Sequence, residues 1–208
     1  MGGADVAVRE TDLLCHELLL RLAGRLPDRH LWRYRDWLAG GAADVLARML
    51  PGTLVRERIP LGDGDFRLLR DALFPLGADP ALVNAILPAK QTRPAHTFVA
   101  TSHTDDSGDP AILVLGATLR GRQGVREVRS SWRRGDGLPL KRVLLVTASA
   151  DVVGLTSEIQ RILRALGEPE PCVEVLPPDV EPTAYHRAAL AESALVCEGA
   201  DELAGHRG

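Results

Sequence analysis

Several residue types are scarce in this 208-residue chain, and each scarcity argues against a class of protein. Aromatic residues make up 4% of it, so a core has to be built mainly from Leu, Val, Ile and Ala. The three cysteines, Cys15, Cys172 and Cys197, are odd in number and far apart. This pattern argues against a disulfide framework or a zinc site and favours free, buried thiols. No run of about 18 apolar residues occurs, so we expect no membrane-spanning helix and no membrane partner.

Lysine is almost absent, because only Lys90 and Lys141 among the 25 basic residues are lysines. With the heavy use of Ala, Gly, Leu and Pro, this preference for arginine is typical of a GC-rich bacterial genome, so it does not by itself indicate nucleic-acid binding. The net charge of −3 gives no general attraction to nucleic acids or anionic membranes. The first residues lack the basic stretch of a signal peptide. We therefore expect a bacterial, cytoplasmic protein.

Catalytic sequence patterns are missing as well, including GxSxG and HExxH. The segment 116–123 has the glycine spacing of a phosphate-binding P-loop but lacks its lysine and its Ser or Thr. His103 with Asp105, Asp106 and Asp109 is a conceivable metal site, but these residues are more typical of a solvated loop. The sequence thus favours a protein without enzymatic activity, and it predicts neither a metal nor a cofactor.

Apolar residues make up 45% of the chain, enough for a buried core, and residues 1–94 predict a region of about five helices. Thr11 is the predicted N-cap of the first helix, and Pro51 is expected to end the third. Asp79 followed by Pro80 predicts the start of the fifth, because Asp caps helices and Pro suits the first turn.

Residues 95–208 predict a mixed sheet, which makes the whole an α+β protein with an α/β-like second half. An antiparallel meander and then a β-α-β-α unit are predicted, with strands at 96–102, 111–118, 125–132, 143–146 and 173–176 and helices at 155–166 and 182–197. The strand at 111–118 is inferred from an almost continuous apolar run, which is typical of a central strand. The sequence leaves open whether the regions 1–94 and 95–208 are separate domains or share one core.

Charge is segregated along the second half of the chain. Residues 118–143 contain eight basic and two acidic residues, a net +6, whereas residues 168–202 have a net charge of −8. The basic segment predicts an interaction surface made of Arg120, Arg122, Arg126, Arg129, Trp132, Arg133 and Arg134. Its expected partner is another protein or a second copy of the chain. Nucleic-acid binding by this basic ribbon is an alternative, and the acidic segment packing beside it is another.

A turn at 147–153 is the second candidate site. Thr147, Ser149 and Asp151 follow a predicted strand and precede a helix, the place where open α/β sheets bind ligands. Ser149 or Asp151 is equally the ordinary N-cap of that helix. The leading prediction is therefore a non-enzymatic interaction or regulatory module, and the alternative is a small-molecule- or nucleotide-binding protein with a Rossmann-like sheet.

Overall fold

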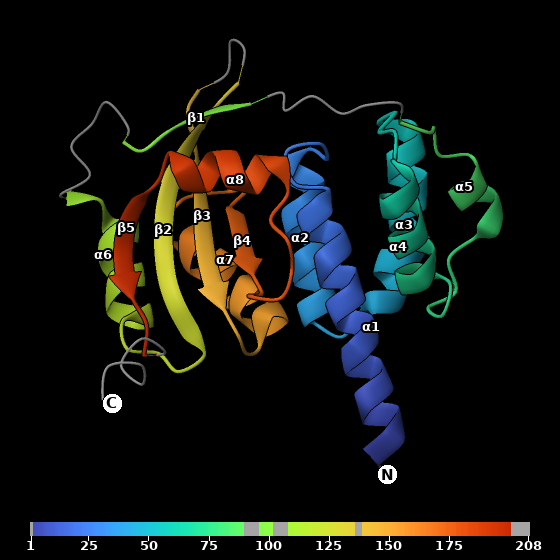
Figure 1. Cartoon of the computed structure of the whole chain (residues 1–208), viewed down its shortest axis with the longest axis horizontal. Coiled ribbons are helices and arrows are strands. Elements are labelled where there is room, and N and C mark those ends of the chain that lie inside the picture. The colour runs from blue at the N-terminus through green and yellow to red at the C-terminus, as the bar shows by residue number, and fades with distance from the viewer. Residues whose placement is uncertain (1, 90–95, 102–107, 136–138, 201–208) are drawn as a thin grey trace. The chain divides into compact units, whose positions relative to one another are not determined.

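The computed structural model describes residues 2–89, 96–101, 108–135 and 139–200. Contacts within the chain divide it into two compact units, Met1–Arg93 and Pro94–Gly208. The described residues form eight helices and a mixed sheet of five strands, which confirms the α+β fold class (Figure 1).

The first unit is helical, as predicted. Its helices are α1 (Gly2–Arg21), α2 (Asp28–Ala39), α3 (Ala43–Arg56), α4 (Asp63–Leu73) and α5 (Pro80–Asn84). The predicted cap of α5 is confirmed, because the Asp79 carboxylate accepts a hydrogen bond of 2.8 Å from the Ala81 N–H. The predicted cap at Thr11 is wrong, since α1 begins nine residues earlier, at Gly2.

The predicted end of the third helix at Pro51 is also wrong, because α3 continues to Arg56. Tertiary contacts offset the hydrogen bond that proline cannot donate. Leu50, Pro51 and Leu54 are all buried. The neighbouring Thr53 accepts a hydrogen bond of 2.7 Å from the Tyr34 hydroxyl on α2. Packing against α2 and α5 therefore outweighs the local preference for a break.

The second unit contains β1 (Thr97–Val99), α6 (Pro110–Leu119), β2 (Val125–Arg134), β3 (Lys141–Ala148), α7 (Val152–Ala165), β4 (Cys172–Leu176), α8 (Ala184–Ala191) and β5 (Ala194–Glu198). β4 lies parallel to β3 after the α7 crossover, as predicted. β2 and β3 are antiparallel. On its other edge β2 pairs with β5 along its first half and with β1 along its last three residues, both antiparallel. The sheet order is therefore β5-β2-β3-β4, with β1 beside the end of β2.

The predicted strand at 111–118 is wrong, because this segment forms helix α6. Asp109 caps the helix through a hydrogen bond of 2.9 Å from the Ala111 N–H, and Pro110 occupies the first turn. Ala111, Leu115 and Leu119 then recur every four residues and are at most 5% exposed. An apolar run suits a strand or a helix equally well, and here the cap selects the helix.

The last predicted helix is too long. α8 ends at Ala191, and the segment 194–198 forms β5, which completes the sheet beside β2. The Ser193 hydroxyl donates to the Leu190 carbonyl at 2.7 Å, which satisfies an acceptor at the end of α8. The predicted order strand, helix, strand, helix over 143–197 is otherwise correct.

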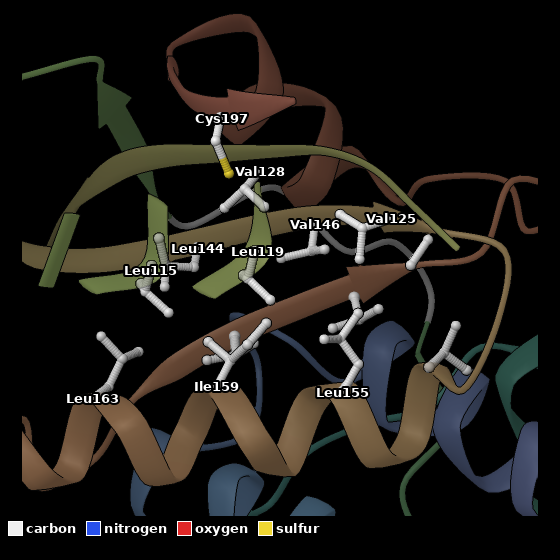
Figure 2. Close-up of a cluster of buried hydrophobic side chains, with 14 of the residues drawn as sticks. Leu115, Leu119, Val125, Val128, Leu144, Val146, Leu155, Ile159, Leu163 and Cys197 are labelled. Atoms are coloured by element: carbon white, nitrogen blue, oxygen red, sulfur yellow. The ribbon is translucent and has the colours of Figure 1, made fainter. Parts of the chain in front are cut away.

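Helices cover both faces of the sheet. α6 and α7 pack against one face, where the side chains of α7 point at the strands (Figure 2). The shared core contains Leu115, Leu119, Val128, Leu144, Val146, Leu155, Ile159, Leu163, Val173, Val175 and Cys197. α8 packs against the opposite face, over β1, β2 and β3 (Figure 1). Strand side chains alternate between the two faces, so β3 is buried along most of its length.

Candidate functional site

The predicted ligand turn lies between the end of β3 and the start of α7. Thr147 is half-buried and pairs with Glu127 on β2, whereas the side chains of Ser149 and Asp151 are exposed. Asp151 is the N-cap of α7, where its carboxylate accepts a hydrogen bond of 3.2 Å from the Gly154 N–H. Its backbone is in the left-handed region, at φ 47°, which a non-glycine residue adopts rarely. The structure therefore assigns Asp151 a capping role and leaves ligand binding at this turn a prediction.

Close backbone packing holds this turn in place. The Ser149 N–H donates to the Gly124 carbonyl at 2.8 Å. Gly124 has a φ of 77°, and a Cβ added there would lie 2.9 Å from the Ala150 Cβ. Only glycine therefore allows the turn before β2 to approach the turn after β3 so closely.

Three of the predicted interaction arginines contact other side chains of their own unit. Arg122 forms a 2.7 Å ion pair with Glu158 on α7. Arg129 donates to the Ser193 hydroxyl at 2.8 Å, and Arg133 donates to the Tyr185 hydroxyl at 3.2 Å. These guanidinium groups fasten α7 and α8 to the sheet. The remaining predicted arginines, Arg120, Arg126 and Arg134, have exposed side chains.

The basic and acidic segments meet within the chain. β5, from the acidic segment, pairs with β2 of the basic segment. Arg142 contacts Asp109 at the start of α6 and lies 3.5 Å from Glu168 after α7. This agrees with the alternative in which the acidic segment packs beside the basic one. Protein, homo-oligomer or nucleic-acid binding by the exposed arginines remains a prediction.

Trp132 takes part in the same cluster. The Arg142 guanidinium lies 4.8 Å from the centre of its ring, and Arg142 itself is only 7% exposed. Burial acts to raise the pKa of Asp109, but hydrogen bonds from Arg142 and from the Ala111 N–H lower it below its ordinary value. Burial raises the pKa of Glu168, although the nearby Arg142 opposes that effect. Trp132 and Arg142 therefore tie the ends of α6 and α7 to the sheet.

A buried line of polar groups connects α8 to β4. The His186 Nε2 lies 3.1 Å from a Glu174 carboxylate oxygen, and the His186 Nδ1 lies 3.0 Å from the Thr183 hydroxyl. The side chains of His186 and Glu174 are each 1% exposed. A hydrogen bond donated from Nε2 and one accepted at Nδ1 would satisfy both contacts. His186 therefore lies in the interior of the second unit, between α8 and β4.

Tyr185, beside His186, is buried too. Burial raises the pKa of its hydroxyl well above the ordinary value, and the Cys172 thiol adds to this, while Arg133 opposes it. The rings of His96 and Phe98 meet the Tyr185 ring edge-on, with centroids 6.0 and 5.2 Å away. This arrangement packs α8 onto β1 and the sheet.

The outward side of α6 is unusual for a surface helix. Its ten residues include no charged side chain, and Thr118 is its one residue with a polar side chain. The side chains of Leu113, Val114, Ala117 and Thr118 are exposed, Leu113 to 61% and Val114 to 39%. We call these four residues the α6 outer face. The Thr118 hydroxyl donates to the Val114 carbonyl at 2.8 Å, so even this group has a partner within the helix.

The described residues offer neither a metal site nor a membrane-spanning helix. The described residues contain no group of three or more His, Cys, Asp or Glu side chains suited to a metal ion. His103, Asp105 and Asp106, which the sequence made a conceivable metal site, lie outside the described residues. None of the described helices combines the length and the apolar character that a membrane span requires.

Comparison with known proteins assigns no family. No protein-family model matches the chain, and neither curated proteins nor solved structures match it significantly.

Sequence reasoning missed the α6 outer face because it treated the segment as a strand. A usable signal was present, since Asp109-Pro110 repeats the Asp79-Pro80 pattern that correctly predicted α5. The Glu174–His186 contact has no comparable signal, because it depends on how α8 lies across the sheet.

Proposed function

We propose that this chain is a non-enzymatic interaction module that binds a protein partner through the α6 outer face. The observation that supports the proposal most is an uncharged surface helix with Leu113 61% exposed. A helix that is apolar all round is normally buried on every side. Exposed apolar faces of this kind are typical of binding surfaces.

The energetics favour covering this face. Burying an exposed Leu or Val side chain contributes up to about 1.5 to 3 kcal/mol. Thr118 adds little desolvation cost, because its hydroxyl already donates to the Val114 carbonyl. The exposed Arg120 at the end of α6 supplies a polar rim beside the apolar centre.

Photo-crosslinking tests the proposal. A photoreactive amino acid is placed at position 113, and at position 166 as the control, because Leu166 is another exposed leucine of the same unit, 41% exposed. We expect a discrete crosslinked protein product from position 113, in lysate of the source cells or in the purified protein. That product should disappear when Val114→Gln is added. No product at position 113, or identical products at both positions, would reject the α6 outer face as a binding surface.

A second candidate function is small-molecule binding at the 147–153 turn. It is favoured by one observation, the exposed Asp151 held at φ 47° at the carboxyl end of β3. Left-handed non-glycine residues often occur at functional sites. Because the Asp151 carboxylate occupies the start of α7, this site suits a hydroxyl-bearing or cationic ligand better than an anion.

A thermal-shift screen of nucleosides, sugars and amines tests this second function. A hit should raise the melting temperature of the natural chain. The rise should disappear in a Ser149→Ala variant, which leaves the cap of α7 intact. A screen without a hit, or a hit that the Ser149 variant retains, would count against this turn as the site.

A further inference from the structure

We infer that the partner of the α6 outer face is a second copy of this chain, with the two α6 helices packed antiparallel. The inference rests on the proposed function, since it uses the same surface. Three properties of α6 support it: the sizes of its exposed side chains, the charges at its two ends, and the direction of its dipole.

Side-chain size makes the α6 outer face complementary to itself. Its side chains form two ridges at i, i+4 spacing, Leu113 with Ala117 and Val114 with Thr118. In an antiparallel pair that crosses between residues 115 and 116, Leu113 lies opposite the partner's Thr118, and Val114 lies opposite the partner's Ala117. Larger side chains then meet smaller ones at every contact, as close packing requires.

The ends of α6 carry opposite charges. Asp109 caps its start, and Arg120, exposed and without an ion pair among the described residues, follows its end. An antiparallel pair brings Arg120 toward the partner's Asp109 at both ends of the contact. Asp109 already bonds Arg142, so the added attraction is modest. The antiparallel order also aligns the helix dipoles favourably, whereas a parallel order would bring like charges together.

The size of this contact sets the expected affinity. A ten-residue helix is about 15 Å long, so the pair buries less area than the roughly 800 Å² per partner of a standard interface. We therefore expect a weak dimer, with a Kd of about 10 µM to 1 mM. Raising the local concentration of the chain would then favour association.

Sedimentation equilibrium of the full chain from micromolar to millimolar concentration tests the dimer. Leu113→Gln should raise the Kd at least about tenfold, because it places a polar group in the apolar contact. Arg120→Glu should raise the Kd by roughly threefold, because at each end of the contact the new carboxylate at position 120 would lie near the partner's Asp109. Leu195→Gln is the matched control and should leave the Kd unchanged, since Leu195 is 50% exposed but lies on β5. Circular dichroism checks that each variant folds.

Disulfide trapping tests the orientation. Val114→Cys protein is mixed with Ala117→Cys protein under mild oxidation, and the three native cysteines are buried. The antiparallel arrangement predicts that the mixed 114–117 disulfide forms faster than the 114–114 or 117–117 product. A faster 114–114 product would overturn the antiparallel arrangement.

The outcomes separate this inference from the proposed function. A chain that stays monomeric at 1 mM, or a dimer that Leu113→Gln leaves intact, overturns the second copy as partner. If the crosslink from position 113 then reaches a different protein, the proposed function stands without self-association. If position 113 gives no crosslink at all, both fail.

Discussion

Single residues in this chain determine how its helices are fastened to the sheet. Glu174 and His186 join β4 to α8 through one buried contact of 3.1 Å. Arg142 joins the start of α6 to β3 and lies close to Glu168 beyond α7. A buried polar group that loses its partner is costly, so each of these contacts predicts a measurable effect on stability.

Removing the Glu174 carboxylate should destabilise the chain. We expect Glu174→Ala to lower the free energy of unfolding by about 2 to 4 kcal/mol, because it leaves a buried ring N–H without its acceptor and opens a cavity. Glu174→Gln keeps an acceptor oxygen and should cost less. Urea unfolding of the full chain measures both variants, and equal losses would show that the contact with His186 is not the cause.

The charge of Asp109 predicts a dependence on pH. Hydrogen bonds from Arg142 and the Ala111 N–H outweigh burial and lower the pKa of Asp109 in the folded protein. A lowered carboxyl pKa stabilises the fold above the unfolded pKa of about 3.9, and this stability is lost as the pH falls through the folded value.

Asp109→Asn isolates this effect, because Asn caps helices about as well as Asp. The natural chain should be more stable than this variant by about 1 kcal/mol at pH 7. This is less than a charge-assisted hydrogen bond can contribute, because solvent partly screens the ion pair at Asp109. The difference should shrink below about pH 4. Urea unfolding at several pH values measures it, and a difference that stays constant down to pH 2.5 would contradict the assigned role of the charge.

At the scale of elements, helix α6 and strand β5 form the edge of the second unit beside β2. α6 buries Leu115 and Leu119 in the core and leaves the α6 outer face in water. β5 pairs with the first half of β2, next to α6. Two glycines at these elements have very different surroundings, which allows a matched test of the packing.

Gly199 and Gly116 should respond oppositely to alanine. A Cβ at Gly199, just after β5, would collide with the Val125 carbonyl oxygen, whereas one at Gly116 would meet only a Val196 methyl at 4.0 Å. We expect Gly199→Ala to destabilise by about 2 to 3 kcal/mol through overpacking. Gly116→Ala should be neutral or stabilise by up to about 1 kcal/mol, because Ala favours helix. Thermal or urea unfolding compares them, and a neutral Gly199→Ala would mean that the end of β5 detaches from β2 at little cost.

At the scale of the whole molecule, the division into two compact units predicts how the chain unfolds. Each unit has buried side chains of its own, in the helices of the first and around the sheet of the second. We expect fragments 1–93 and 94–208, expressed separately, to give native-like circular dichroism and cooperative unfolding. Fragments that fold only when mixed would show that the two regions share one core.

Local sequence patterns determined much of the fold. The i, i+4, i+7 spacing in α7, the apolar run of β3 and the Asp-Pro start of α5 are local signals, and the structure confirms these elements. They work because caps, periodicity and backbone preferences depend on residues close together in the chain. The same logic extends to Asp109-Pro110, so the helical state of α6 was present in the sequence although the apolar run indicated a strand.

Only the tertiary structure decided the features that bear on function. Helix α3 continues through Pro51 because its surroundings are packed, and Glu174 meets His186 because α8 folds back over the sheet. Whether Leu113 or Leu115 lies in water depends on which side of α6 contacts the sheet. The sequence by itself determined that α6 is apolar all round. Packing against the sheet then buried the side of α6 that carries Leu115 and Leu119, and it left the α6 outer face exposed as the proposed binding surface.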